Sequence, residues 1–221
     1  ANYQGTFFVL AELNNRIFAS TPSPSLTILS STQPETERKS EEQILNDSSD
    51  LSVDGSSLTF ESVLGTNSQI IFVGDNGETA TLSTAPATFD NNGSNGNGGS
   101  YFPSISADGR YVAFHSYATN FMEGGDNGYA DIFLADLQST SSRLKKLSVS
   151  ASGASTTGGS FYPSVSGDGS IVAFESLAPD LGVDPTPFFS DIFLYHLADD
   201  TISSITFPVA NGTSLGSFQP D

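Results

Sequence analysis

The oxygen-bearing side chains best suited to metal binding lie in one glycine-rich loop, Met122 to Asp131 (MEGGDNGYAD). Calcium takes six to eight oxygen ligands, and carboxylates, amide oxygens and backbone carbonyls all serve. The loop offers Glu123, Asp126, Asn127 and Asp131, and its glycines let the backbone curl so that carbonyls can join them. The sequence therefore predicts a calcium site here, with calcium as the only expected cofactor. The complete EF-hand pattern is absent, and the alternative is an Asx-type turn.

Histidine is the side chain most often used for acid–base chemistry near neutral pH, and this chain has 2. His115 takes a position at which other copies of a repeated segment have Glu61 and Glu175, and His196 replaces the equivalent of Asp136. Because acids occupy these positions elsewhere, we expect a solvent-exposed face. Glu61, His115 and Glu175 are then expected to form part of a polar ring, and no residue is expected to be catalytic.

A formal G-x-S-x-G pattern occurs at residues 212–216 (GTSLG). A nucleophile elbow requires a strand before the serine and a helix after it. Here both flanking segments are typical of strands, so we interpret the motif as a loop and predict that the chain is not an enzyme.

The segments that would position these residues occur twice. YFPSISADGRYVAF at 101–114 returns as FYPSVSGDGSIVAF at 161–174, and DIFLADL at 131–137 returns as DIFLYHL at 191–197. Both pairs keep an offset of 60 residues, so the copied unit is the whole stretch. It contains four strand-like segments, the first two joined by Asp-Gly, which is a strong hairpin signal.

Shorter copies lie outside this pair. Residues 51–62 (LSVDGSSLTFES) and 69–75 (QIIFVGD) match its first three strands. Residues 7–13 and 26–31 are typical of the third and fourth strands of a preceding unit, and 217–221 (SFQPD) matches the opening of a further one.

Aspartates at turns and strand starts are expected to be structural. Asp108 and Asp168 suit the hairpin turn, whereas Asp131 and Asp191 suit a hydrogen bond at the start of a strand. The GDNG segment at 74–77 is predicted to be a hairpin turn with Asn-Gly at its corner.

Charged residues mark two other features. Lys145 and Lys146 lie in the fourth strand of the unit, where exposed lysines would discourage edge-to-edge aggregation. Residues 35–45 (ETERKSEEQIL) are the best helix candidate, with a turn or two expected at most.

Four short antiparallel strands in a unit of about 40–60 residues are typical of propeller blades. The repeat resembles those of TolB-type, WD-like propellers, with P-x-(I/V/W)-S-x-D-G-x-x-(I/V)-A-F followed by D-(I/V)-(F/Y)-(L/V)-x-(D/N)-(L/A). The matching residues are Pro103, Ser106, Asp108, Gly109, Val112, Ala113, Phe114, Asp131, Ile132, Phe133, Leu134, Asp136 and Leu137, and again Pro163, Ser166, Asp168, Gly169, Val172, Ala173, Phe174, Asp191, Ile192, Phe193, Leu194 and Leu197. The resemblance implies an all-β fold of four-stranded antiparallel propeller blades and says little about activity.

We divide the chain as one β-propeller region, residues 1–221, with about four blades in a partial or small propeller. The expected parts are a partial blade with a polar linker, three blades, and the start of a further blade, at residues 1–46, 47–100, 101–160, 161–217 and 218–221. Two arrangements follow. We favour a fragment of a larger propeller, and the alternative is a four-bladed ring in which the strand beginning at Phe218 joins the N-terminal strands.

Composition restricts the partners. A net charge of −18 with only 7 Lys and Arg excludes neutralisation of a row of phosphates, so we expect no nucleic-acid partner. No run of about 20 apolar residues is present, so we expect no membrane insertion. The absence of cysteine excludes disulfides. Few lysines beside many small polar residues are typical of an exported bacterial protein, located outside the cell, on its surface or in the periplasm.

Together these features predict a non-enzymatic extracellular module for binding or structure, built on TolB-like repeats. We expect it to be calcium-stabilised and to bind a protein or glycan, or to self-associate into a homo-oligomer or filament through open blade edges. The alternative is an accessory propeller domain of a larger, peptidase-like hydrolase or lyase whose catalytic domain is not in this chain.

Overall fold

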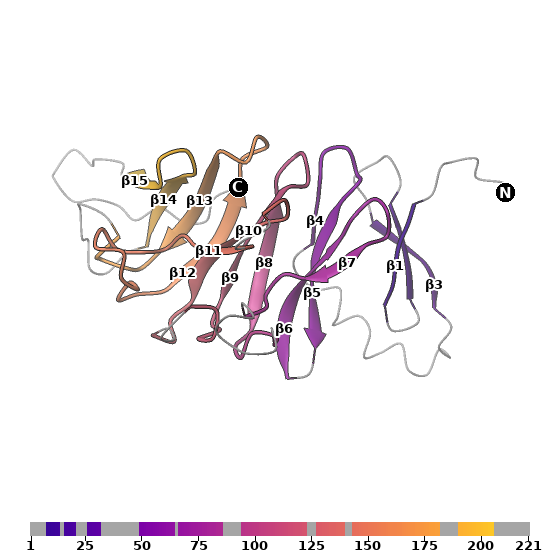
Figure 1. The fold of residues 1–221 in the computed structure, drawn as a ribbon, viewed down its shortest axis with the longest axis horizontal. Coiled ribbons are helices and arrows are strands. Elements are labelled where there is room, and N and C mark those ends of the chain that lie inside the picture. Colours follow the sequence, from indigo (N-terminus) through magenta and orange to yellow (C-terminus); the bar gives the residue numbers. More distant parts are fainter. Residues whose placement is uncertain are drawn as a thin grey trace.

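The computed structural model describes residues 8–13, 16–20, 26–31, 49–64, 66–85, 94–122, 127–139, 143–181 and 190–205, the first three ranges by their backbone alone. Within these ranges there are strands and turns but no helix. The sheets follow one another along the long axis of the molecule (Figure 1).

Three sheets each contain four antiparallel strands, paired in sequence order. We call them blades 1, 2 and 3. Blade 1 has β4 (Ser49–Leu51), β5 (Leu58–Leu64), β6 (Asn67–Val73) and β7 (Thr79–Thr81); blade 2 has β8 (Ser100–Ile105), β9 (Tyr111–Ser116), β10 (Asp131–Asp136) and β11 (Leu144–Lys146); blade 3 has β12 (Ser160–Val165), β13 (Ile171–Ser176), β14 (Asp191–His196) and β15 (Thr201–Ile205). The expected all-β fold of four-stranded blades is confirmed.

The N-terminal sheet has three strands, β1 (Phe8–Leu13), β2 (Arg16–Ser20) and β3 (Leu26–Ser31), in the order β1-β2-β3. The sequence predicts β1 and β3 as consecutive strands, and the structure places β2 between them. The segment RIFAS is only five residues long, too short for its alternation to stand out. The helix candidate at 35–45 and the segments at 212–216 and 217–221 lie outside the described residues.

The core lies between the blades. Ile70 and Leu82 of blade 1 pack with Phe114 and Phe133 of blade 2 in one buried cluster. A second cluster joins the other face of blade 2 to blade 3, with Ile132 against Phe174 and Tyr195 among others. Because blade 2 is covered on both faces, β9 is buried at five successive positions, whereas β13 alternates between buried and half-buried residues.

The first strands of neighbouring blades lie beside one another and are joined by hydrogen bonds. The Ile105 backbone N–H of blade 2 donates to Asp50 Oδ2 of blade 1 at 2.8 Å. One blade further on, the Val165 N–H donates to Ser104 Oγ at 3.1 Å. The hairpin turns also touch, since the Ala107 N–H donates to the Gly167 carbonyl at 2.9 Å. These contacts repeat because each blade meets the next with the same strand.

The Asp-Gly hairpin turns form as predicted. Ser106 Oγ and the Arg110 N–H donate to Asp108 Oδ1 at 2.6 and 3.0 Å, and these hydrogen bonds hold the pKa of Asp108 below its usual value. Gly169, in the equivalent turn of blade 3, has a φ of +70°, and a Cβ there would collide with the Tyr111 ring of blade 2. Glycine is therefore required both by the backbone and by the close approach of the two blades. The predicted Asn-Gly hairpin corner is confirmed too, with Gly77 at φ +76°.

Candidate functional site

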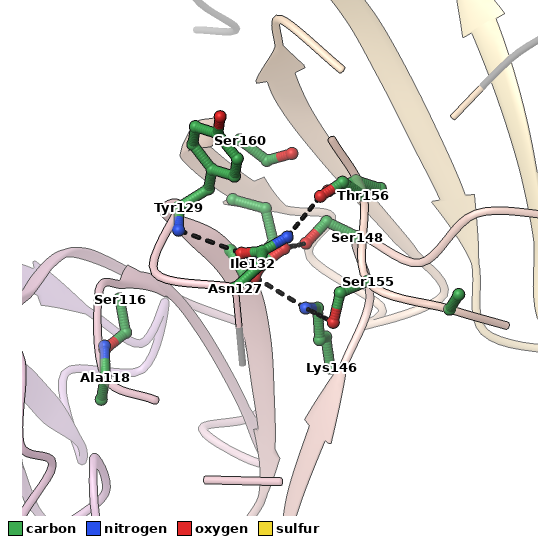
Figure 2. Close-up of polar contacts among 12 residues, drawn as sticks. Ser116, Ala118, Asn127, Tyr129, Ile132, Lys146, Ser148, Ser155, Thr156 and Ser160 are labelled. Atoms are coloured by element: carbon green, nitrogen blue, oxygen red, sulfur yellow. Dashed lines mark hydrogen bonds and ion pairs between the residues drawn. The ribbon is translucent and has the colours of Figure 1, made fainter. Parts of the chain in front are cut away.

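Asp131, one of the four predicted calcium ligands, is fully buried at the start of β10 and has protein partners on both carboxylate oxygens. Lys146 Nζ lies 2.7 Å from its Oδ2, and Ser148 Oγ donates to its Oδ1 at 2.6 Å. Lys146 Nζ also donates to Ser155 Oγ at 3.0 Å, and the Ile132 N–H donates to Ser148 Oγ at 3.0 Å. Figure 2 shows Lys146, Ser148 and Ser155 gathered at this point. The network ties the start of β10 to β11 and to the residues that follow it.

The two edge lysines do not both face solvent as predicted. Lys146 is buried, because Asp131 supplies a counter-charge inside the blade. Lys145, its neighbour on the strand, points the other way and forms an exposed ion pair with Asp200 of blade 3. Of the two lysines of this strand, one forms an ion pair within its own blade and the other forms an ion pair with the next blade.

Blade 1 contains a neutral version of the same network. The strand register aligns Ile70 with Ile132, so Gln69 takes the place of Asp131. Ser83 Oγ donates to Gln69 Oε1 at 2.6 Å and accepts from the Ile70 N–H at 2.9 Å. The Gln69 amide nitrogen donates to the Gly96 carbonyl at 3.2 Å. The arrangement around Asp131 is thus a feature of the blade.

The remaining predicted calcium ligands are only partly described. Asn127 Oδ1 accepts from the Tyr129 N–H at 3.0 Å, as in an Asx-type turn, and its amide nitrogen donates to the Thr156 carbonyl (Figure 2). Glu123 and Asp126 lie outside the described residues. Within the described part of the chain, no group of three or more Asp, Glu or His side chains could hold a metal ion. A calcium site in this loop stays a prediction, and Asp131 would have to release its present partners to join it.

A different group of residues gathers around His115, on the side where blades 2 and 3 meet. Its imidazole ring has five aromatic neighbours, with centroids 5.5 to 6.1 Å away. We call these six residues the aromatic cluster: Tyr101, Phe102, His115, Tyr117, Phe161 and Tyr162.

A bulge in the first strand of each blade builds this cluster. In β8, Phe102 and Pro103 lie between the paired positions Tyr101 and Ser104, opposite a single residue of β9. Phe102 has a φ of +53°, and Tyr162 has a φ of +50° at the equivalent position of blade 3. Neighbouring side chains of a regular strand point to opposite faces. The bulge instead brings two successive rings to His115, at a backbone cost of about 1–3 kcal/mol for each such residue.

His115 is only 4% exposed, and within the described part of the chain its Nδ1 has no hydrogen-bond partner. Burial lowers its pKa from 6.5 to about 4, so the ring is neutral at pH 7. The expected solvent-exposed position is therefore wrong for this residue. At the same place in blade 1, Glu61 Oε1 accepts from the Phe102 N–H of the next blade at 2.7 Å. In blade 2, rings of blade 3 cover the histidine instead.

The three tyrosines of the cluster are the residues that carry its hydroxyl groups, and they differ in exposure. Tyr117 is 44% exposed, whereas Tyr101 and Tyr162 are half-buried. Burial, together with the nearby phenols of Tyr101 and Tyr162, raises the pKa of Tyr117. The aromatic cluster therefore offers ring surfaces and phenol hydroxyl groups. The sequence prediction grouped His115 with Glu61 and Glu175 and missed the aromatic rings, although the YFP and FYP triplets and Tyr117 were visible signals.

The second histidine lies elsewhere. His196 is at the end of β14 opposite Ile171, whereas Glu175 pairs with Ile192 near the other end of that strand. Its Nε2 lies 3.0 Å from Ser203 Oγ, in an exposed contact. The structure does not bring the two histidines together. None of the described residues belongs to a helix long and apolar enough to cross a membrane.

No family model and no curated protein matches this chain. Similar solved structures include TolB from Acinetobacter baumannii, with 15% identity and a TM-score of 0.48 over 86% of this chain and 37% of that one. A putative TolB from Agrobacterium tumefaciens has 19% identity and a TM-score of 0.45 over 86% of this chain and 60% of that one. Acylaminoacyl peptidase from Pyrococcus horikoshii has 10% identity and a TM-score of 0.42 over 88% of this chain and 29% of that one. The chain thus spans less than two thirds of the length of each of these proteins. Two of them are TolB structures, and TolB-type propellers are the proteins whose repeats this sequence resembles.

Proposed function

We propose that this chain is a non-enzymatic binding module of an exported protein, in which the β-propeller blades present the aromatic cluster to a protein partner. The observation that carries the proposal is that two aromatic residues at equivalent bulges, Phe102 and Tyr162, both have a positive backbone φ. Backbone strain of this kind persists where the surrounding fold imposes it and is common at binding sites. Tyrosine-rich surfaces are also frequent centres of protein interfaces.

A role in binding fits the use of the charged side chains. Asp54, Asp108 and Asp168 each accept hydrogen bonds within their own hairpin turn. Asp131 is occupied by an ion pair, and burial keeps His115 neutral. Because the framework uses these groups, they support a scaffold better than acid–base catalysis.

Export and calcium belong to the same proposal. A net charge of −18 favours a soluble protein that attracts cations and basic partners. The loop with Glu123 and Asp126 is the proposed calcium site.

The proposal is tested by affinity selection. The chain is immobilised and challenged with a displayed library of random peptides at about 0.15 M salt, with calcium and with chelator. Enriched peptides are then synthesised and titrated calorimetrically. We expect a related set of peptides that binds with micromolar or tighter dissociation constants. Enrichment no greater than on an unrelated acidic protein would overturn the proposal, and cleavage of the bound peptides would show an enzyme instead.

A further inference from the structure

We propose that the aromatic cluster binds a positively charged arginine or lysine side chain of the partner, placed against Tyr101, Tyr117 and Tyr162 above His115. This inference rests on the proposed function and specifies its chemistry. It also names the junction of blades 2 and 3 as the point of contact.

Four of the five rings around His115 contact it in two orientations, one stacked and three nearly perpendicular. The His115 ring stacks on Phe102 with an interplanar angle of 16° and a centroid distance of 5.5 Å. Tyr117, Phe161 and Tyr162 stand nearly perpendicular to His115, at 78° and twice 79°. The perpendicular rings pack against His115, and Tyr117, which is 44% exposed, offers a ring surface that attracts a cation placed over it.

The polar groups of the cluster suit a cationic donor. The cluster contains three phenol hydroxyls, and the pKa of Tyr117 is raised first by burial and then by the phenols of Tyr101 and Tyr162. Phenol oxygens accept hydrogen bonds from ammonium or guanidinium N–H groups. His115 Nδ1 is buried beneath the rings and has no hydrogen-bond partner in the described residues.

Charge complementarity also favours a cation. Glu61 and Glu175, at the positions equivalent to His115, flank the cluster on the neighbouring blades; Glu61 bonds to the Phe102 N–H and Glu175 pairs with Phe161. The cluster itself contains no lysine or arginine. Among the described residues of this site an anionic ligand would therefore meet acids and neutral rings, whereas a basic segment is attracted by the net negative charge of the chain.

The repeats supply substitutions that the fold already tolerates. Tyr101, Tyr117 and Tyr162 correspond to Phe161, Leu177 and Phe102 in the other blade. The variants Y101F and Y162F therefore remove a hydroxyl, and Y117L removes a ring, each with a residue that the fold uses at the same place. Tyr129, which is 52% exposed in the loop before β10, provides the matched control Y129L.

The experiment titrates the full chain with the blocked tripeptide acetyl-Gly-Arg-Gly-amide and with its neutral citrulline analogue, at about 0.15 M salt. Binding is followed by NMR of tyrosine-labelled protein. We expect the citrulline peptide to bind at least about tenfold more weakly, and Y117L to weaken arginine binding about fivefold while Y129L leaves it unchanged. The Tyr101 and Tyr117 ring signals should shift.

Equal binding of the two peptides, or equal losses in Y117L and Y129L, would overturn the inference. Tighter binding of a neutral oligosaccharide such as cellohexaose at the same rings would overturn it in favour of a glycan. Library-selected peptides that bind Y117L as tightly as the unchanged chain would leave a binding role for the chain standing, but would remove the aromatic cluster as the binding site. A library that yields no binder would count against the proposed function itself.

Discussion

The ammonium group of Lys146 lies 2.7 Å from the carboxylate of Asp131, and both side chains are buried inside blade 2. Blade 1 has neutral residues in place of this ion pair, because Gln69 and Thr81 occupy the positions equivalent to Asp131 and Lys146. A buried ion pair stabilises little by itself, but removal of one partner leaves a charge that water cannot reach.

The variant K146M should therefore lower the free energy of unfolding by about 3–5 kcal/mol, since Asp131 keeps its buried charge but loses its counter-charge. The double variant D131Q/K146T, which copies blade 1, should recover most of that loss. Urea denaturation of both variants measures the difference. If the double variant is as unstable as K146M, the charge of Asp131 is not the cause.

His115 should make stability depend on pH. Its pKa is lowered to about 4 in the folded chain, whereas the unfolded chain has the ordinary value of 6.5. Between these values the unfolded state binds more protons, so stability is complete above about pH 6.5 and falls as the pH drops toward 4. The expected loss is about 3 kcal/mol.

Thermal unfolding across this pH range tests the assignment with two variants. H115F should flatten the dependence, because none of the remaining rings of the cluster titrates between pH 4 and 6.5. H196Q should keep it, because the contact between His196 and Ser203 is exposed to solvent. A slope that survives in H115F would assign the effect to other groups.

The two Asp-Gly turns at Gly55 and Gly169 separate backbone strain from contact between blades. Both have a φ of +70°, but a Cβ on Gly55 would meet nothing within 4 Å, whereas one on Gly169 would collide with the Tyr111 ring. G55A should cost about 1 kcal/mol, and G169A should cost clearly more. Equal losses in chemical denaturation would mean that the ring moves aside freely.

Calcium binding to the Glu123–Asp131 loop predicts a higher melting temperature in calcium than in chelator. D126N should abolish this difference, because it removes a charged ligand. D75N is the matched control, since Asp75 lies in the same GDNG sequence within a hairpin turn. Identical melting temperatures with and without calcium would contradict the predicted site.

Local sequence determined the blades themselves. The strands of blades 2 and 3 and their Asp-Gly turns are set by alternation of side chains and by glycine at positive φ, which are properties of neighbouring residues. They could therefore be predicted, and so could the Asn-Gly corner at Gly77.

The tertiary structure decided which side chains are enclosed. Lys146 lies in a strand whose sequence is typical of a polar sheet edge. His115 lies at a position that is acidic in the other repeats. Both side chains are nevertheless buried. Lys146 is paired with Asp131 on the neighbouring strand β10, and His115 is covered by Phe161 and Tyr162 of the next blade. Burial depends on what another segment brings against a residue, and strand periodicity carries no information about that neighbour.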